Sequence, residues 1–180
     1  IGDKALTSNT TGDGNVGIGR EALTTQTTAL YNTAVGFQAG YATTTGGSNV
    51  AIGAESLEKN TTGISNVAIG RQALHFNTTA SNNTAVGFQS LYDNTTGTEN
   101  VAVGRLALNQ ATTASYNTAI GTNALQDNTT GDNNTALGRS ALTNNTTAAN
   151  NTAVGYKAGV AVTTGDNNTA VGSQALDANT

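Results

Sequence analysis

A glycine recurs every 17 residues along this 180-residue chain, without an insertion or a deletion anywhere. From the second glycine onward an asparagine precedes it by four residues, and a threonine follows each glycine by eight residues, from Thr10 to Thr180. A fixed period of this kind indicates one structural unit stacked on copies of itself, so that each residue type forms a column along the stacking axis. Taking this glycine as position 0, the glycine column is Gly2, Gly19, Gly36, Gly53, Gly70, Gly87, Gly104, Gly121, Gly138, Gly155 and Gly172.

The five residues that end at each glycine alternate in character. They follow the pattern Asn-Thr/Val-Ala-Val/Ile-Gly, so that the residues at positions −3 and −1 share one face and asparagine, alanine and glycine share the other. Alternation with a period of 2 and β-branching favour a short strand. A helical repeat is disfavoured, because Thr, Asn and Gly are poor helix formers and no apolar stripe has helical spacing. A meander of hairpins is disfavoured because Asn-Gly turns are absent.

The sequence therefore predicts an all-β fold, a parallel β-solenoid (β-roll) with 17 residues, two short strands and two turns per coil. The chain holds about ten and a half such coils. Because the array starts and stops in mid-repeat, residues 1–180 are predicted to be a single uncapped repeat array and a segment of a longer fibrous protein.

Two sets of residues are predicted to hold the coils together. The asparagines at position −4 should stack as a buried ladder, because an amide can donate to and accept from the coils above and below. The glycines from Gly36 to Gly155 should serve a positive φ or a close backbone approach. The ladder asparagines are Asn32, Asn49, Asn66, Asn83, Asn100, Asn117, Asn134, Asn151 and Asn168. The interior is predicted to consist of the −1 residues and the +4 leucines: Val35, Ile52, Ile69, Val86, Val103, Ile120, Leu137, Val154, Val171, Leu57, Leu74, Leu91, Leu108, Leu125 and Leu142.

The repeat is specific enough to suggest a family. Residues 32–40 and 134–142, with Thr-Thr-Gly spacers between such stretches, resemble the Asn-Thr-Ala-Val-Gly-x-x-Ala-Leu repeats of phage tail fibres and giant bacterial surface proteins. The chain also resembles the head repeats of trimeric autotransporter adhesins, which have a shorter coil; Val50–Gly53 keeps their Val-Ala-Ile-Gly core. The resemblance covers the whole chain. It implies a left-handed β-roll of three chains around an axis and an extracellular attachment role.

Few residues offer catalytic, cofactor or metal chemistry. His75 is the sole histidine and occupies a variable position, and Asp93 and Asp127 share one column two coils apart with no base or nucleophile beside them. One aspartate after the Thr-Thr-Gly turn, as at Asp132, is fewer than calcium-binding repeats provide. We therefore expect no catalytic, cofactor-binding or metal-binding residue, and no enzymatic activity. The Asn-Thr-Thr triplets match the N-glycosylation pattern, which regular Asn-Thr repetition produces by itself.

Charge and hydropathy limit the partners. A net charge of −4 with scattered lysine and arginine gives no footprint for nucleic acid. The apolar stretches are too short for membrane insertion. The thin core predicted for one coil favours sharing between chains, so the first expected partner is a second copy of the chain.

Position +1 alternates in a way that bears on contacts. Its arginines, Arg20, Arg71, Arg105 and Arg139, never occupy neighbouring coils, and aromatic residues often stand between them. Duplication of a 34-residue unit explains this pattern, and so does the repulsion of stacked guanidinium groups, which an intervening ring would relieve. Exposed aromatics are predicted either to form a seam between chains or to contact a host-surface glycan or protein; they are Phe37, Phe88, Tyr156, Tyr31 and Tyr116.

These features predict a non-enzymatic structural or adhesive fibre segment outside the cell, on a cell surface or a virion: an adhesin shaft or head, or a phage tail fibre, formed by a homotrimer. The alternative is a single-chain solenoid that polymerises into an extracellular matrix filament. An ice-binding solenoid is a remote alternative, because the threonines are adjacent and therefore point to opposite sides of the chain.

Overall fold

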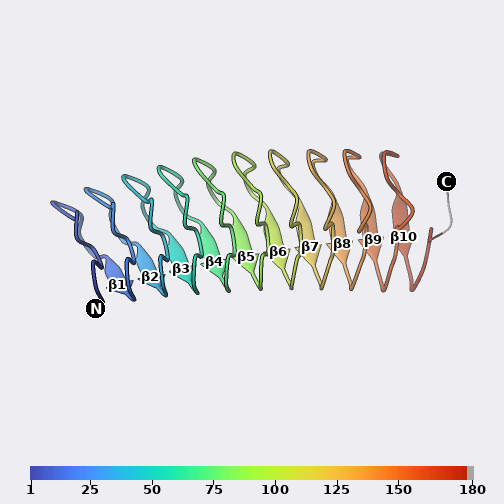
Figure 1. The fold of residues 1–180 in the computed structure, drawn as a ribbon. Coiled ribbons are helices and arrows are strands. Elements are labelled where there is room, and N and C mark those ends of the chain that lie inside the picture. Colours follow the sequence, from blue (N-terminus) through green and yellow to red (C-terminus); the bar gives the residue numbers. More distant parts are fainter. Residues whose placement is uncertain (178–180) are drawn as a thin grey trace.

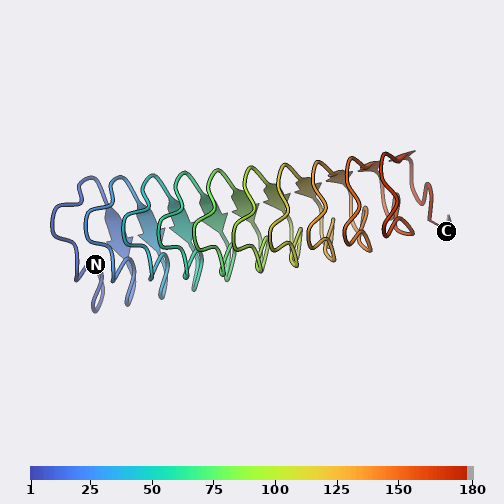
Figure 2. The ribbon, with the colours of Figure 1, turned by 90° about the horizontal axis from the view of Figure 1, so that it is seen from above.

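The computed structural model describes residues 1–177, so Thr180, the last member of the threonine column, lies outside the described residues. The chain winds into a rod of regularly stacked coils, with its two ends at opposite ends of the rod (Figures 1 and 2). Ten strands form one parallel sheet in the order of the sequence. This confirms a parallel β-solenoid, with about 9–10 coils of about 17 residues. The strands are β1 (Val16–Ile18), β2 (Thr33–Val35), β3 (Val50–Ile52), β4 (Val67–Ile69), β5 (Thr84–Val86), β6 (Val101–Val103), β7 (Thr118–Ile120), β8 (Thr135–Leu137), β9 (Thr152–Val154) and β10 (Thr169–Val171).

Neighbouring strands pair in register with residues one period apart. In the pair of β3 and β4, Ala51 lies opposite Ala68, and Ile52 lies opposite Ile69. The same register holds for every neighbouring pair from β1 to β10. Each column of the sequence is therefore also a column in space.

Each coil has one strand, so the prediction of two strands per coil is wrong. The rest of the coil turns repeatedly through the left-handed region, as at Glu55 (φ 58°), Leu57 (φ 50°) and Ser65 (φ 57°). Such dihedrals are incompatible with an extended strand. The turns still bond to the next coil, since the Leu57 N–H donates to the Ala73 carbonyl at 3.0 Å. Coil-to-coil hydrogen bonding thus continues beyond the three strand residues.

The strands face the opposite way from the prediction. The alanines at position −2 point inward, with Ala68 at 0% exposure, whereas Ile52 and Ile120 at position −1 are 39% and 41% exposed. The physical reason is that the +4 leucines reach across a narrow interior onto the strand. Where glycine replaces the inward alanine, at Gly17, an added Cβ would lie 3.0 Å from Leu6 Cγ, so the inward face has room for alanine but not for a larger residue. The residues wrongly assigned to the interior are Val35, Ile52, Ile69, Val86, Val103, Ile120, Leu137, Val154 and Val171.

The interior consists of leucine and alanine. The leucines at position +4 are at most 1% exposed, and they pack with the alanines at positions −2 and +3 in one continuous cluster along the rod. The interior leucines named in the sequence analysis are Leu57, Leu74, Leu91, Leu108, Leu125 and Leu142.

The glycine at position 0 is required both by its backbone and by its neighbours. Gly87 has φ 131°, which side-chain-bearing residues rarely adopt, and a Cβ on it would lie 2.6 Å from the carbonyl oxygen of Gly104 in the next coil. The other position-0 glycines from Gly19 to Gly155 repeat this geometry. This column is where consecutive coils approach most closely.

The asparagines at position −4 are buried and bonded to the following turn of the chain. Asn66 is 0% exposed; its Oδ1 accepts the Asn83 backbone N–H at 3.0 Å, and its Nδ2 donates to the Ala80 carbonyl at 2.9 Å. The main partners are therefore backbone groups, with amide-to-amide bonds as an addition in some coils, as from Asn100 to Asn83 at 3.2 Å. Asn32 to Asn151 are buried, and Asn168 is half-buried.

A second buried asparagine column, at position +7, was not predicted. Asn77 Nδ2 donates to Asn60 Oδ1 at 2.9 Å and to the Ala80 carbonyl at 3.0 Å. The Ala80 oxygen thus accepts from two asparagine columns, which satisfies both of its lone pairs. These asparagines begin five of the Asn-Thr-Thr triplets, and their burial keeps them from solvent: Asn60, Asn77, Asn94, Asn128 and Asn145.

The threonines at position +8 bond along the rod. Thr61 donates both its N–H, at 2.8 Å, and its Oγ1–H, at 3.0 Å, to the carbonyl of Thr78. The hydroxyls of this column are therefore engaged within the chain, whereas the neighbouring threonines at +9 are exposed. No helix in residues 1–177 has the length and hydropathy needed to cross a membrane.

Candidate functional site

The outer face of the sheet is the largest regular surface on the rod. It carries two columns, Val or Thr at position −3 and Val, Ile or Leu at position −1, over all ten strands. Val16 and Ile18 in β1 are 43% and 41% exposed, and Ile69 in β4 is 36% exposed. At a strand spacing of about 4.8 Å, the face is about 45 Å long. Soluble monomers rarely expose an apolar patch of this extent.

Position +1 follows each strand and pairs arginines with aromatic rings in adjacent coils. The guanidinium carbon lies 4.5, 5.9 and 5.6 Å from the ring centroid in Arg20–Phe37, Arg71–Phe88 and Arg139–Tyr156, respectively. The structure therefore supports the expected attraction between an arginine and a neighbouring ring. These three aromatics remain partly exposed, so the same stacks also form one border of the outer face.

The other two predicted contact residues lie at the opposite ends of the strands. Tyr31 and Tyr116, at position −5, precede their strands and are 64% and 55% exposed. Tyr31 lines a shallow recess of about 400 Å³ together with Leu30 and Ile64. The recess forms where Gly47, between Leu30 and Ile64 in the −6 column, has no side chain. The five predicted contact residues thus fall on two borders of the face rather than in one cluster.

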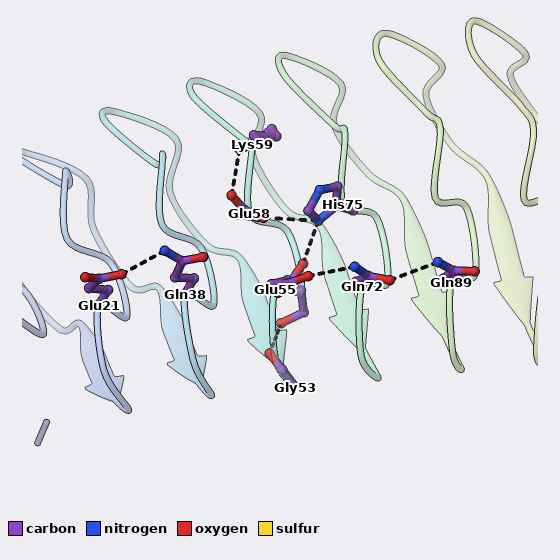
Figure 3. Close-up of polar contacts among 10 residues, drawn as sticks. Glu21, Gln38, Gly53, Glu55, Glu58, Lys59, Gln72, His75 and Gln89 are labelled. Carbon is purple, nitrogen blue, oxygen red and sulfur yellow. Dashed lines mark hydrogen bonds and ion pairs between the residues drawn. The ribbon is translucent and has the colours of Figure 1, made fainter.

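A polar cluster breaks the repeat between the coils of β3 and β4. Glu55, Glu58 and His75 bring ligand atoms within 4.8 Å of one another, and among residues 1–177 they are the one group of three such side chains. His75 Nδ1 lies 3.3 Å from Glu58 Oε2 and 3.1 Å from the Glu55 backbone oxygen. Figure 3 shows the imidazole between the two glutamates. Glu58 and His75 are buried, at 8% and 7% exposure.

Neighbouring side chains hold this cluster in place. Gln72 Nε2 donates to Glu55 Oε2 at 2.6 Å, and Lys59 Nζ pairs with Glu58 Oε1 at 2.6 Å (Figure 3). The His75 ring stacks on Tyr92, with centroids 5.2 Å apart and an interplanar angle of 12°. Each of the three residues is thereby restricted in orientation by a direct neighbour.

The field at this junction is negative. Burial raises the pKa of Tyr92, and the carboxylates of Asp93, Glu55 and Glu58 raise it further. Burial also raises the pKa of Asp93, against a smaller opposing effect of His75. Three carboxylates therefore act on a small, partly buried volume in which Lys59 supplies the one permanent positive charge among the contacts of the cluster.

Sequence reasoning noted His75 but found no partner for it. The partners lie three and six positions apart in different columns, so no local motif connects them. The signal that was available is the occurrence of glutamate and histidine in successive coils of one column, at Glu58 and His75. Comparison with protein-family models, with curated proteins and with solved structures found no match to this chain.

Proposed function

We propose that this chain is a structural segment of an extracellular fibre, in which copies of the chain associate through the outer face of the ten-stranded sheet. The observation that supports this proposal is the unbroken pair of outer columns at −3 and −1, half-exposed along the whole rod. A side chain that recurs in every coil is a poor recognition code for a varied partner. It suits a partner with the same period, and a second copy of the chain has that period.

The size of the face fits this role. About 45 Å of sheet and about 13 Å of strand width give roughly 600 Å² for one chain. This approaches the roughly 800 Å² per partner of a standard stable interface, and the arginine–aromatic stacks at the border would add to it. Enclosing the face would bury the −1 residues that a single chain leaves half-exposed.

The repeat resemblance supports a finer form of the proposal. It favours three chains around an axis, a left-handed coil, and a location on a cell surface or a virion, as in adhesin heads and phage tail fibres. In that setting the rod is a non-enzymatic shaft, and Tyr31 and Tyr116 at its border are positioned for contact with a surface glycan or protein.

Light scattering after size-exclusion chromatography tests the proposal. The expected mass is three times the 18.0-kDa chain. The variant Ile52→Lys/Ile69→Lys places charge on the outer face and should reduce the mass to that of one chain. The control Thr62→Lys/Thr79→Lys adds the same charge in the same two coils at exposed +9 positions and should keep the oligomer.

Three results would overturn the proposal. A wild-type mass of one chain would show that the face is not an interface. Loss of the oligomer in the threonine variant but not in the isoleucine variant would place the interface elsewhere. Long fibres in negative stain that persist in the isoleucine variant would favour the single-chain filament.

A further inference from the structure

We propose that Glu55, Glu58 and His75 form a binding site for one divalent transition-metal ion of the zinc type, which fastens the coil of β3 to the coil of β4. This inference does not depend on self-association. It rests on a mixed donor set of two carboxylates and one imidazole, on the distances between them and on their burial.

The donor set has suitable chemistry. Zinc and its neighbours in the first transition row bind imidazole nitrogen and carboxylate oxygen at about 2.0–2.2 Å. Donors to one ion at that distance lie up to about 4 Å apart, and here all three lie within 4.8 Å of one another. Shifts of less than about 1 Å would therefore bring them onto one ion. A fourth position would remain for water.

Orientation and charge also favour a cation. Glu58 directs Oε1 to Lys59 and Oε2 to His75, so one oxygen faces the centre of the cluster. Gln72 donates to Glu55, which is the kind of outer contact that orients a ligating carboxylate. Buried carboxylates are normally paired or bound to metal, and the local charge here is negative.

The repeat supplies an internal comparison. Glu21 occupies the same +2 column as Glu55 and accepts a hydrogen bond from Gln38 at 2.7 Å, just as Glu55 accepts one from Gln72 (Figure 3). The +5 residues of that coil and the next are Thr24 and Tyr41, so the Glu21 coil has the carboxylate without the other donors. The proposed site therefore occurs at one junction and not as part of the repeat.

The consequence is a local staple between two coils. Glu55 and Glu58 belong to one coil and His75 to the next, so an ion bound by all three links turns that are otherwise joined by hydrogen bonds. Ligand binding to the folded chain alone raises its stability in proportion to the logarithm of the ion concentration. Separation of these coils should then depend on free metal.

Isothermal titration of the untagged chain with ZnCl₂ at neutral pH tests the inference. We expect one Zn²⁺ per chain and a higher melting temperature by circular dichroism, with MgCl₂ and CaCl₂ giving neither, because both ions prefer all-oxygen sites. The variants Glu58→Gln and His75→Gln should lose the saturable binding. Gln72→Ala should weaken it by about 10–100-fold, as for the loss of an outer contact. The matched control Glu21→Gln should bind as the wild type does.

His75 gives a second readout that needs no variant. As the sole histidine, it contributes one imidazole spin system to the NMR spectrum, and its Nδ1 resonance should shift with Zn²⁺ until one equivalent is bound. The proposal is overturned if the wild type shows no saturable Zn²⁺ binding, if the imidazole resonances do not move, or if Glu21→Gln weakens binding as much as Glu55→Gln does.

Discussion

Asn100 is the ladder residue whose replacement should be most informative. Its Oδ1 accepts the Asn117 backbone N–H at 3.0 Å, and its Nδ2 donates to the Ala114 carbonyl at 2.8 Å. In this coil the +7 position holds Ala111 rather than asparagine, so no second amide reaches the Ala114 oxygen from that column. The variant Asn100→Leu keeps the branching of the side chain and removes both hydrogen bonds. It leaves two buried backbone groups without these partners.

Asn66 provides a matched comparison in a coil with both asparagine columns. In Asn66→Leu the Ala80 oxygen keeps its bond from Asn77 at 3.0 Å, so that only the Asn83 N–H loses its partner. An unsatisfied buried polar group costs about 1–3 kcal/mol. The expected loss of unfolding free energy is therefore about 2–6 kcal/mol for Asn100→Leu and about 1–3 kcal/mol for Asn66→Leu.

The measurement combines urea unfolding, followed by circular dichroism at one protein concentration, with amide hydrogen exchange. Exchange is needed because stacked repeats can open locally, and its site-specific protection reports the affected coil. Exchange of the Asn117 amide should accelerate in Asn100→Leu, and that of the Asn83 amide in Asn66→Leu. Equal losses of stability in the two variants, or an unchanged Asn117 amide, would refute the reasoning that the carbonyl is satisfied by two columns.

Other positions test the remaining parts of the structure. Leu74→Ala should lower the free energy of unfolding by about 2–5 kcal/mol, and Ile69→Ala by less than about 1 kcal/mol in the isolated chain; equal losses in urea would contradict the inward position of the leucines. Gly87→Ala should cost at least about 3 kcal/mol in the same assay, because φ is 131° and the new Cβ would lie 2.6 Å from the Gly104 oxygen; a near-neutral variant would show that the backbone relaxes. Burial raises the pKa of Asp93 in the folded chain, which favours its protonated form, so this contribution to stability is present at low pH and is lost as the pH rises through the raised pKa. Asp93→Asn should therefore melt higher than the wild type at about pH 7 and equally at about pH 2.5, and an advantage that persists at the lower pH would contradict this cause.

The periodicity of the sequence carried most of the fold. A fixed spacing without insertions requires equal coils in register, and the glycine column indicates where those coils approach each other. It does not distinguish inside from outside, because alternation with a period of 2 defines two faces and is symmetric between them. Size suggested Ile69 for the interior, yet Ala68 lies there, since leucines from the turns already occupy the space.

Features that occur once or intermittently were beyond the reach of the pattern. The +7 column is interrupted by Gln26, Thr43 and Ala111, so its asparagines resembled turn residues rather than an interior ladder. The group around His75 depends on how a +2 residue and two +5 residues meet across coils. That meeting is set by the path of the turns, which includes left-handed residues such as Leu57 that no propensity rule assigns to that conformation.

The in-register stacking of the coils also bears on how the length of such a rod can change during evolution. Loss of residues 80–96 would remove one whole coil and leave every remaining column in phase, shortening the rod by about 4.8 Å. It would also remove Phe88 and place Arg71 directly beside Arg105 in the +1 column. Loss of residues 80–113 would instead bring Thr122 beside Arg71 and avoid the contact between like charges. At this part of the rod, the gain or loss of two coils at a time is therefore the step that both the backbone and the surface charges tolerate.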